Sequence, residues 1–141
     1  METLEKNLWG LFKKHLPMAC HVQRVETGGT GQGIPDVNLC HLGEETWVQL
    51  KIVKGKKVML SPQQVVWHHK RCNAAKGSSW ILARDKADGV RKGKYDRLYL
   101  WKGGEAAEVF DKGVETPGAE VFNTPFDWPR LMAILFPKAH S

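Results

Sequence analysis

The segment that begins at Ser61 constrains the fold most, because three signals agree that a helix starts there. Ser61 is a typical N-cap residue, Pro62 suits the first helical position, and Gln64 completes a capping box with the serine. The following residues carry no helix breaker until Gly77, which we expect to end the helix after about Lys76. The sequence therefore predicts one well-bounded helix in the middle of the chain.

Apolar segments on either side of this helix predict an α/β domain. Residues 46–53 and 79–84 have the composition of buried strands, and a helix between two strands of one sheet usually joins parallel neighbours. The other expected elements are an amphipathic helix at 2–16, strands at 20–26, 36–42, 97–101 and 107–110, a turn at 43–45 and a C-terminal helix at 127–136. We expect one domain over residues 1–141, with the first three strands forming an antiparallel meander.

Length and charge narrow the class of protein. A chain of 141 residues with 42% hydrophobic residues can bury one core, and its net charge of +6 favours a polyanionic partner, either nucleic acid or an anionic membrane surface. Charge alone does not choose between them. The sequence has neither an apolar stretch of about 20 residues nor a leader-like N-terminus, so we expect a soluble, cytoplasmic protein.

The three cysteines are widely spaced and odd in number, which argues against a disulfide framework. We expect Cys20, Cys40 and Cys72 to be reduced thiols. Each has a histidine beside it or at helical spacing, so a structural zinc site is an alternative, although no CxxC pair supports it.

Polar residues within an apolar strand indicate where chemistry takes place. Side chains alternate along a strand, so Gln49 and Lys51 share one face of segment 46–53 and the intervening apolar residues share the other. Asp36, at the start of the neighbouring strand, adds a carboxylate. Carboxylate and amide oxygens suit a hard divalent cation, and a lysine beside them can stabilise charge on a phosphate. The combination predicts phosphodiester hydrolysis, whereas each feature alone more often marks a turn or a wet strand face.

These residues resemble the PD-(D/E)xK nuclease superfamily and, within it, the virus-type replication-repair nuclease (VRR-NUC) group, whose small phage members carry Gln in place of Glu. The resemblance covers residues 33 to about 67 and fades after Arg84. It implies a restriction-endonuclease-like three-layer core, with a mixed β-sheet flanked by helices. The matching residues are Gly33, Pro35, Asp36, Gln49, Lys51, Ser61, Pro62 and Gln64.

The resemblance also implies a metal site and an activity. Mg²⁺ or Mn²⁺ would be held by Asp36, the Gln49 side chain, a main-chain carbonyl near Leu50 and Glu5, with Glu2 as the rival for the last position. A neutral amide binds a cation less strongly than a carboxylate, so either the N-terminal acid makes up the charge, or metal affinity is weak, or activity is lost. The implied protein is a metal-dependent DNA endonuclease of phage or prophage type. It would act in the host cell on Holliday junctions, flaps or other branched DNA, as a homodimer.

Several nearby residues have two interpretations. Ser61 and Gln64 can close the capping box or support the active site, and we favour the cap. His68 and His69 are interpreted as packing or surface groups rather than general bases. The glycine-rich segment 28–33 lacks a P-loop pattern and is expected to be a mobile loop that approaches DNA.

Basic residues flank the expected site and are predicted to contact phosphates. They form two groups, Lys54, Lys56 and Lys57 in the first, and Arg84, Lys86, Arg91, Lys92 and Lys94 in the second. Three other functions stay open: an exonuclease or nicking enzyme, a DNA-binding module of the same fold that has lost turnover through Gln49, and a zinc-stabilised DNA-binding protein.

Overall fold

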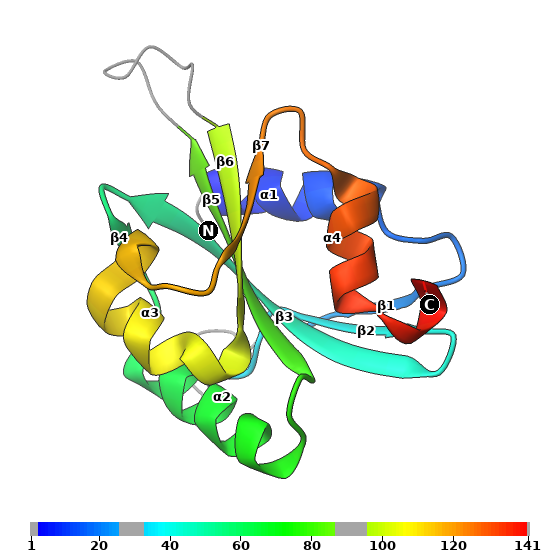
Figure 1. Ribbon diagram of the computed structural model, residues 1–141, viewed down its shortest axis with the longest axis horizontal. Coiled ribbons are helices and arrows are strands. Elements are labelled where there is room, and N and C mark those ends of the chain that lie inside the picture. Colours follow the sequence, from blue (N-terminus) through cyan, green and yellow to red (C-terminus); the bar gives the residue numbers. More distant parts are fainter. Residues whose placement is uncertain (1–2, 26–32, 87–95, 141) are drawn as a thin grey trace.

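The computed structural model describes residues 3–25, 33–86 and 96–140 of the chain, and Figure 1 shows their arrangement. The helices and strands are α1 (Thr3–Lys14), β1 (His21–Arg24), β2 (Val37–His41), β3 (Glu44–Lys54), β4 (Lys57–Val58), α2 (Pro62–Ala74), β5 (Ser79–Lys86), β6 (Asp96–Lys102), α3 (Ala106–Lys112), β7 (Glu120–Asn123) and α4 (Trp128–Leu135). Short 3₁₀ turns η2 (Gly103–Glu105), η3 (Gly113–Glu115) and η4 (Lys138–His140) complete the described elements. The predicted order of helix, three strands, helix and strand is confirmed, with a short β4 that the sequence did not predict.

All described strands belong to one mixed sheet. Its order is β1-β2-β3-β5-β6-β7, and β4 pairs with the far end of β3. Strands β1, β2 and β3 form the predicted antiparallel meander. Strand β5 returns after α2 to lie parallel to β3, with Trp47 opposite Ser79, as the crossover helix predicted.

Helices cover both faces of this sheet, which makes three layers (Figure 1). Helices α1 and α4 lie on one face and α2 and α3 on the other, so the mixed α/β class is confirmed. The first apolar cluster joins α1 and α4 to the sheet through Leu8, Phe12, Val48, Leu50, Ile52, Leu82 and Leu131, among others. The second joins α3 and the opposite face through Ile81, Ala83, Trp101, Ala106 and Val109, with Val65 of α2 packed against it.

Helix α2 begins as predicted. The amide of Gln64 donates to Oγ of Ser61 at 3.1 Å, and the amide of Ser61 donates to Oε1 of Gln64 at 2.8 Å, which closes the capping box. The helix ends slightly before the predicted residue, because Ala75 adopts an extended conformation (φ −155°) as the C-cap. In the described part of the chain, no helix combines the length and apolarity needed to cross a membrane.

Two local predictions were wrong. Residues 107–110 were expected to form a strand, because Val109 and Phe110 favour one, but they lie in α3, where Ala106 and Val109 are buried at helical spacing. The missing edge strand is β7, which pairs with β6. The turn expected at 43–45 is instead a hairpin turn at Leu42 and Gly43, both with positive φ, so Glu44 already belongs to β3.

Candidate active site

Asp36 sits where the pairing of β2 with β3 stops. The last paired residues are Val37 and Val48, so Asp36 lies opposite Gln49 just beyond the ladder. Its Oδ2 atom accepts a hydrogen bond from the amide of Leu50 at 2.7 Å and another from Nε2 of Gln49 at 3.2 Å. The Asp36 side chain therefore takes the place of a strand partner at this point. It contacts the Gln49 amide, but the amide turns its NH₂ group and not the expected oxygen toward the carboxylate.

A close contact with α2 fixes the segment that carries Asp36. Gly33 is buried with a φ of +77°, which favours glycine, and a Cβ added there would collide with the carbonyl oxygen of Gln63 and lie 2.9 Å from the amide of Gln64. Pro35 is buried as well. Residues 33 to 36 are thus packed closely between the first turn of α2 and the sheet. This packing explains why glycine and proline precede the aspartate.

Arg24 of β1 is a neighbour of Asp36 that sequence reasoning missed. Its Nη1 atom lies 3.4 Å from Oδ1 of Asp36 and donates to the main-chain oxygen of the same residue at 3.3 Å. The guanidinium also lies over the ring of Trp9, 5.2 Å from the centroid. Both charged side chains are only about one-fifth exposed (19% and 20%), so the arginine compensates the carboxylate in a partly desolvated place. No motif marks Arg24, because strand pairing alone brings it to Asp36.

The other end of the Gln49 amide faces His68 of α2. Gln49 is 1% exposed and His68 is fully buried. Oε1 of Gln49 lies 3.3 Å from Nε2 of His68, and Nδ1 of His68 lies 3.0 Å from Oγ of Ser79. Of the two roles expected for His68, packing and surface exposure, the structure shows packing in the interior, and it adds a hydrogen-bonded contact to the candidate site.

The direction of these hydrogen bonds follows from their partners. Burial lowers the pKa of His68 to about 4, so the ring is neutral at pH 7 and carries one N–H. An amide oxygen only accepts, so this proton is on Nε2, and Nδ1 accepts from the Ser79 hydroxyl. In this series of hydrogen bonds, Ser79 donates to His68, His68 donates to Gln49, and Gln49 donates to Asp36.

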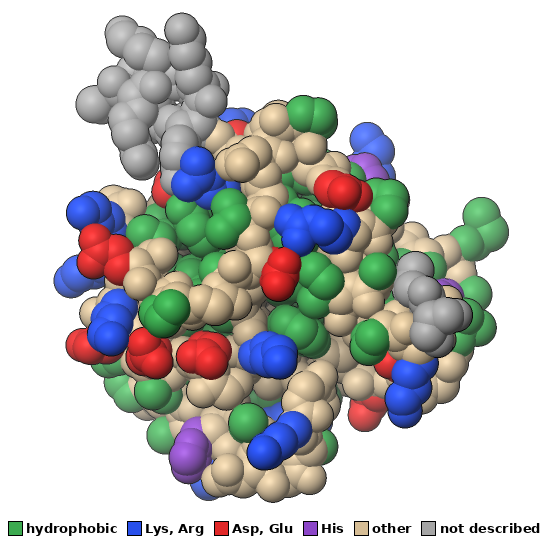
Figure 2. Space-filling model, viewed as in Figure 1, with side chains coloured by type: hydrophobic (Ala, Val, Ile, Leu, Met, Phe, Trp, Pro, Cys, Tyr) green, Lys and Arg blue, Asp and Glu red, His purple; other side chains and the backbone are tan. Residues whose placement is uncertain are grey.

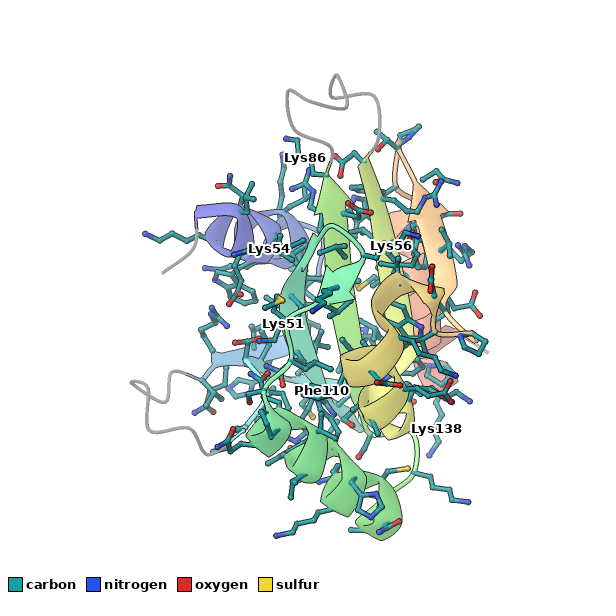
Figure 3. The ribbon with its side chains drawn as sticks, turned by 90° about the vertical axis from the view of Figure 1, so that its left-hand side faces the viewer. Lys51, Lys54, Lys56, Lys86, Phe110 and Lys138 are labelled. Carbon is teal, nitrogen blue, oxygen red and sulfur yellow. The ribbon has the colours of Figure 1, made fainter. Side chains whose placement is uncertain are left out.

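Lys51 lies two residues beyond Gln49 on the same face of β3. It is half-buried, whereas Val48, Leu50 and Ile52 are buried on the opposite face against α1 and α4, which confirms the predicted alternation. Figure 3 shows Lys51 on β3 between the levels of α1 and α2. Lys51 thus lies on the sheet face that carries Gln49, the residue that contacts Asp36.

The site has few side chains that could act as ligands to a metal ion. Among residues 3–25, 33–86 and 96–140, no three or more His, Cys, Asp or Glu side chains are grouped to hold a metal ion. Glu5 is half-buried in the first turn of α1, which packs on the sheet face opposite Gln49, and Glu2 lies outside the described residues. The described cysteines are free, as predicted, and do not assemble a zinc site within those ranges.

A weakly held hard cation nevertheless fits the donors around Asp36. In a β-strand, the N–H and C=O groups of one residue point to the same side of the strand. The Leu50 carbonyl therefore points to the side of β3 on which the Leu50 N–H donates to Asp36. Mg²⁺ keeps several waters and is often bound through only one or two carboxylates. Asp36 and the Leu50 carbonyl meet this requirement, whereas the Gln49 oxygen is directed at His68.

The first basic group surrounds the β3–β4 turn. Lys54, Lys56 and Lys57 are exposed there, and Lys56 pairs with Glu115 at 3.2 Å on the surface, which is a weak, screened interaction. Figure 3 shows Lys54 and Lys56 at this turn. The group therefore places three exposed lysines on one turn at the end of the strand that carries Gln49 and Lys51.

The residues of the second basic group have different environments in the structure. Arg84 makes a two-pronged ion pair with Asp96, at 3.0 and 2.8 Å, and its side chain is only 12% exposed, which counts against the predicted phosphate contact. Lys86 is exposed and borders an open groove of about 460 Å³ together with Lys6 and Lys14 of α1. Arg91, Lys92 and Lys94 lie outside the described residues, as do residues 28–32 of the glycine-rich segment.

An aromatic group lies beside the Gln49–His68 contact. Trp47 and Trp67 meet edge to face with ring centroids 5.5 Å apart, and the Arg71 guanidinium lies 4.7 Å from the Trp67 centroid and 5.7 Å from that of Trp47. All three are half-buried, and neither indole belongs to the two apolar clusters. Sequence reasoning did not identify this group, because a strand position and a helix position far apart in the chain give no local signal.

No protein-family model and no curated protein matches this chain. The assignment of function therefore depends on the residues of the site and on their geometry. Fold alone does not specify a reaction, since one architecture carries many chemistries.

Proposed function

We propose that this protein is a metal-dependent endodeoxyribonuclease similar to the PD-(D/E)xK superfamily and its VRR-NUC group. The observation that carries the proposal is the pair of hydrogen bonds that Asp36 accepts from Gln49 and Leu50, next to Lys51 in the sequence, at the point where β2 separates from β3. The order of the elements and the parallel β3–β5 pair agree with the architecture that the resemblance implies.

Each residue has a separate part in the proposed reaction. Asp36 and the Leu50 carbonyl would hold Mg²⁺ or Mn²⁺, which when bound polarises a phosphoryl oxygen and lowers the pKa of a coordinated water. Lys51 stabilises negative charge that develops on the phosphate in the transition state. Arg24 and Lys51 give the site two positive charges against the one carboxylate of Asp36, so a phosphodiester is attracted to it.

The proposed DNA contact lies on the side that carries Lys51 and Lys54, which Figure 3 presents to the viewer. On the face shown in Figure 2, acidic and basic side chains are interspersed, which suits a polyanion less well. Branched DNA and a homodimer, in which two sites meet two strands, belong to the same proposal and are supported by the resemblance.

Cleavage assays with defined DNA substrates test this proposal. Single-stranded, duplex, flap and four-way-junction DNA would each be incubated with the protein in Mg²⁺, Mn²⁺ or EDTA. We expect metal-dependent endonucleolytic cleavage that Asp36→Asn abolishes and that Asp111→Asn, at an exposed position of α3, leaves unchanged. Cleavage that persists in EDTA, or in the Asp36 variant, would refute the assignment.

A second candidate function is DNA binding without turnover. It is favoured by one observation, the direction of the Gln49 oxygen toward His68, which leaves Asp36 with few additional donors for a cation. This candidate predicts tight binding of DNA and no cleavage with either metal. The same assays, together with a binding titration, distinguish the two functions.

A further inference from the structure

The two ends of the Gln49 side-chain amide contact different kinds of hydrogen-bonding group, a carboxylate at one end and an imidazole at the other. The Asp36 carboxylate accepts hydrogen bonds, so the NH₂ group faces it, and the oxygen is left to face His68. At 1% exposure the amide has little access to solvent. If a cation replaced the NH₂ group beside Asp36, the amide would need its oxygen on that side and its NH₂ group toward His68.

His68 and Ser79 can satisfy the amide in either orientation. In the observed state Nε2 of His68 donates to Gln49, and Nδ1 accepts from the Ser79 hydroxyl. A neutral imidazole has a second tautomer in which Nε2 accepts and Nδ1 donates, and a hydroxyl can accept as well as donate. The Gln49–His68 and His68–Ser79 hydrogen bonds can therefore both be reversed, and a cation then takes the place of the NH₂ group as the partner of the Asp36 carboxylate.

The surroundings keep this pair in place. Ser79 is the first residue of β5 and is 4% exposed. Gly103 of η2 closes over both groups, since a Cβ added there would collide with Oγ of Ser79 and lie 2.7 Å from Nδ1 of His68. Helix α2, strand β5 and turn η2 thus fix the two side chains against the amide, so a reversal needs no movement of the backbone.

We propose that His68 and Ser79 are positioning residues that allow the Gln49 amide to present NH₂ to Asp36 in the metal-free protein and its oxygen to a divalent cation in the loaded protein. In the loaded state Nε2 of Gln49 donates to Nε2 of His68, and Nδ1–H of His68 donates to Oγ of Ser79. The imidazole loses a proton at Nε2 and gains one at Nδ1 by exchange with solvent, so its charge does not change. The inference rests on the proposed metal site at Asp36.

The tautomer of His68 can be read directly, without substrate. Two-bond ¹H–¹⁵N correlation spectra of the full ¹⁵N-labelled chain at pH 7 distinguish the Nε2–H form from the Nδ1–H form. We expect the Nε2–H form in EDTA and the Nδ1–H form at saturating Mg²⁺. His41, which is buried on the opposite face against Phe136, is an internal reference whose tautomer should stay the same.

Two variants make the test specific. Asp36→Asn should abolish the Mg²⁺-induced change, because it removes the carboxylate that holds the cation. Gln49→Glu should hold His68 in the Nε2–H form with and without Mg²⁺, because a carboxylate oxygen can only accept from it. A structural role of His68 alone would not produce this difference between the wild type and the Gln49 variant.

The outcomes separate this inference from the proposed function. If Mg²⁺ binds, cleavage depends on Asp36 and His68 remains in the Nε2–H form, the inference is overturned and the nuclease assignment stands. A simultaneous change of tautomer at His41 also overturns it, since the effect would then be global. If Mg²⁺ produces neither a spectral change nor cleavage, the inference and the proposed function both fail.

Discussion

Replacing Gln49 with glutamate places a second carboxyl group beside Asp36, and its cost can be estimated from the structure. The Gln49 amide nitrogen lies 3.2 Å from Oδ2 of Asp36 in an almost fully buried place. Two negative charges at that separation repel by about 5 kcal/mol at an effective dielectric constant of about 20. Protonating the new carboxyl at pH 7, from an ordinary pKa of about 4.3, costs about 4 kcal/mol and restores a hydrogen-bond donor to Asp36. The protonated form therefore limits the penalty to about 4 kcal/mol.

Thermal unfolding in EDTA measures this penalty. For a domain of this size 1 kcal/mol corresponds to roughly 3–5 °C, so we expect the Gln49→Glu variant to melt roughly 10–20 °C below the wild type at pH 7. The protonation cost falls to about 1 kcal/mol or less at pH 5, so the difference should shrink as the pH falls. Millimolar Mg²⁺ should also reduce the difference, because a cation between the two carboxylates replaces the repulsion with attraction. Cleavage with Mg²⁺ should be retained or raised.

The exposed Gln23 on β1 provides the matched control. Gln23→Glu adds the same charge at the surface and should change the melting temperature by no more than about 2 °C, whether or not Mg²⁺ is present. A Gln49→Glu variant that melts with the wild type in EDTA would refute the reasoning, because the amide could not then lie beside Asp36. A destabilised variant that Mg²⁺ fails to rescue would show that no cation is bound between the two positions.

Four further changes test other parts of the structure. Lys51→Ala should lower the cleavage rate about 100-fold or more while DNA affinity changes little, which single-turnover kinetics and a binding titration would separate. Substituting Lys54, Lys56 and Lys57 together with alanine should reduce the salt dependence of DNA binding, by up to about 0.9 in the log–log slope for each phosphate that is no longer neutralised, and an unchanged slope would exclude these residues from the interface. Because burial lowers the pKa of His68 from 6.5 to about 4, the unfolded chain binds the proton more readily, so the free energy of unfolding should fall by about 3 kcal/mol from pH 6.5 to pH 4. Urea unfolding across this range should show a flatter profile for His68→Asn. Gly33→Ala should lower the melting temperature sharply, since φ is +77° and the new Cβ meets the backbone of α2, whereas Gly10→Ala, at an open position of α1, should be neutral or stabilising.

The features that could be predicted from sequence are those encoded by neighbouring residues. The capping box at Ser61 and Gln64 uses groups three positions apart, and the alternation around Gln49 follows from strand geometry, so both can be recognised in the sequence alone. The contact of Gln49 with His68 depends on how α2 crosses the sheet. No local pattern indicates it.

The same distinction explains what was missed and what was wrong. Arg24 reaches Asp36 only because β1 pairs with β2, and Ser79 reaches His68 only because β5 begins level with Trp47 of β3. The helix α3 was predicted as a strand, because a short segment with Val109 and Phe110 favours extended structure when tertiary contacts are ignored. Packing of Ala106 and Val109 against the sheet outweighs that preference.

The division of β3 between core and site limits how its sequence can vary. Gln49 and Lys51 lie on the sheet face that α2 and α3 cover, while Val48, Leu50 and Ile52 lie on the face that α1 and α4 cover. The two sets alternate along the strand. Inserting or deleting one residue between Trp47 and Val53 would exchange the two faces, which would bury an ammonium group among leucines and turn apolar side chains toward Asp36. This strand can therefore accept many substitutions but not a change of length, because a change of length would disrupt the core and the candidate site together.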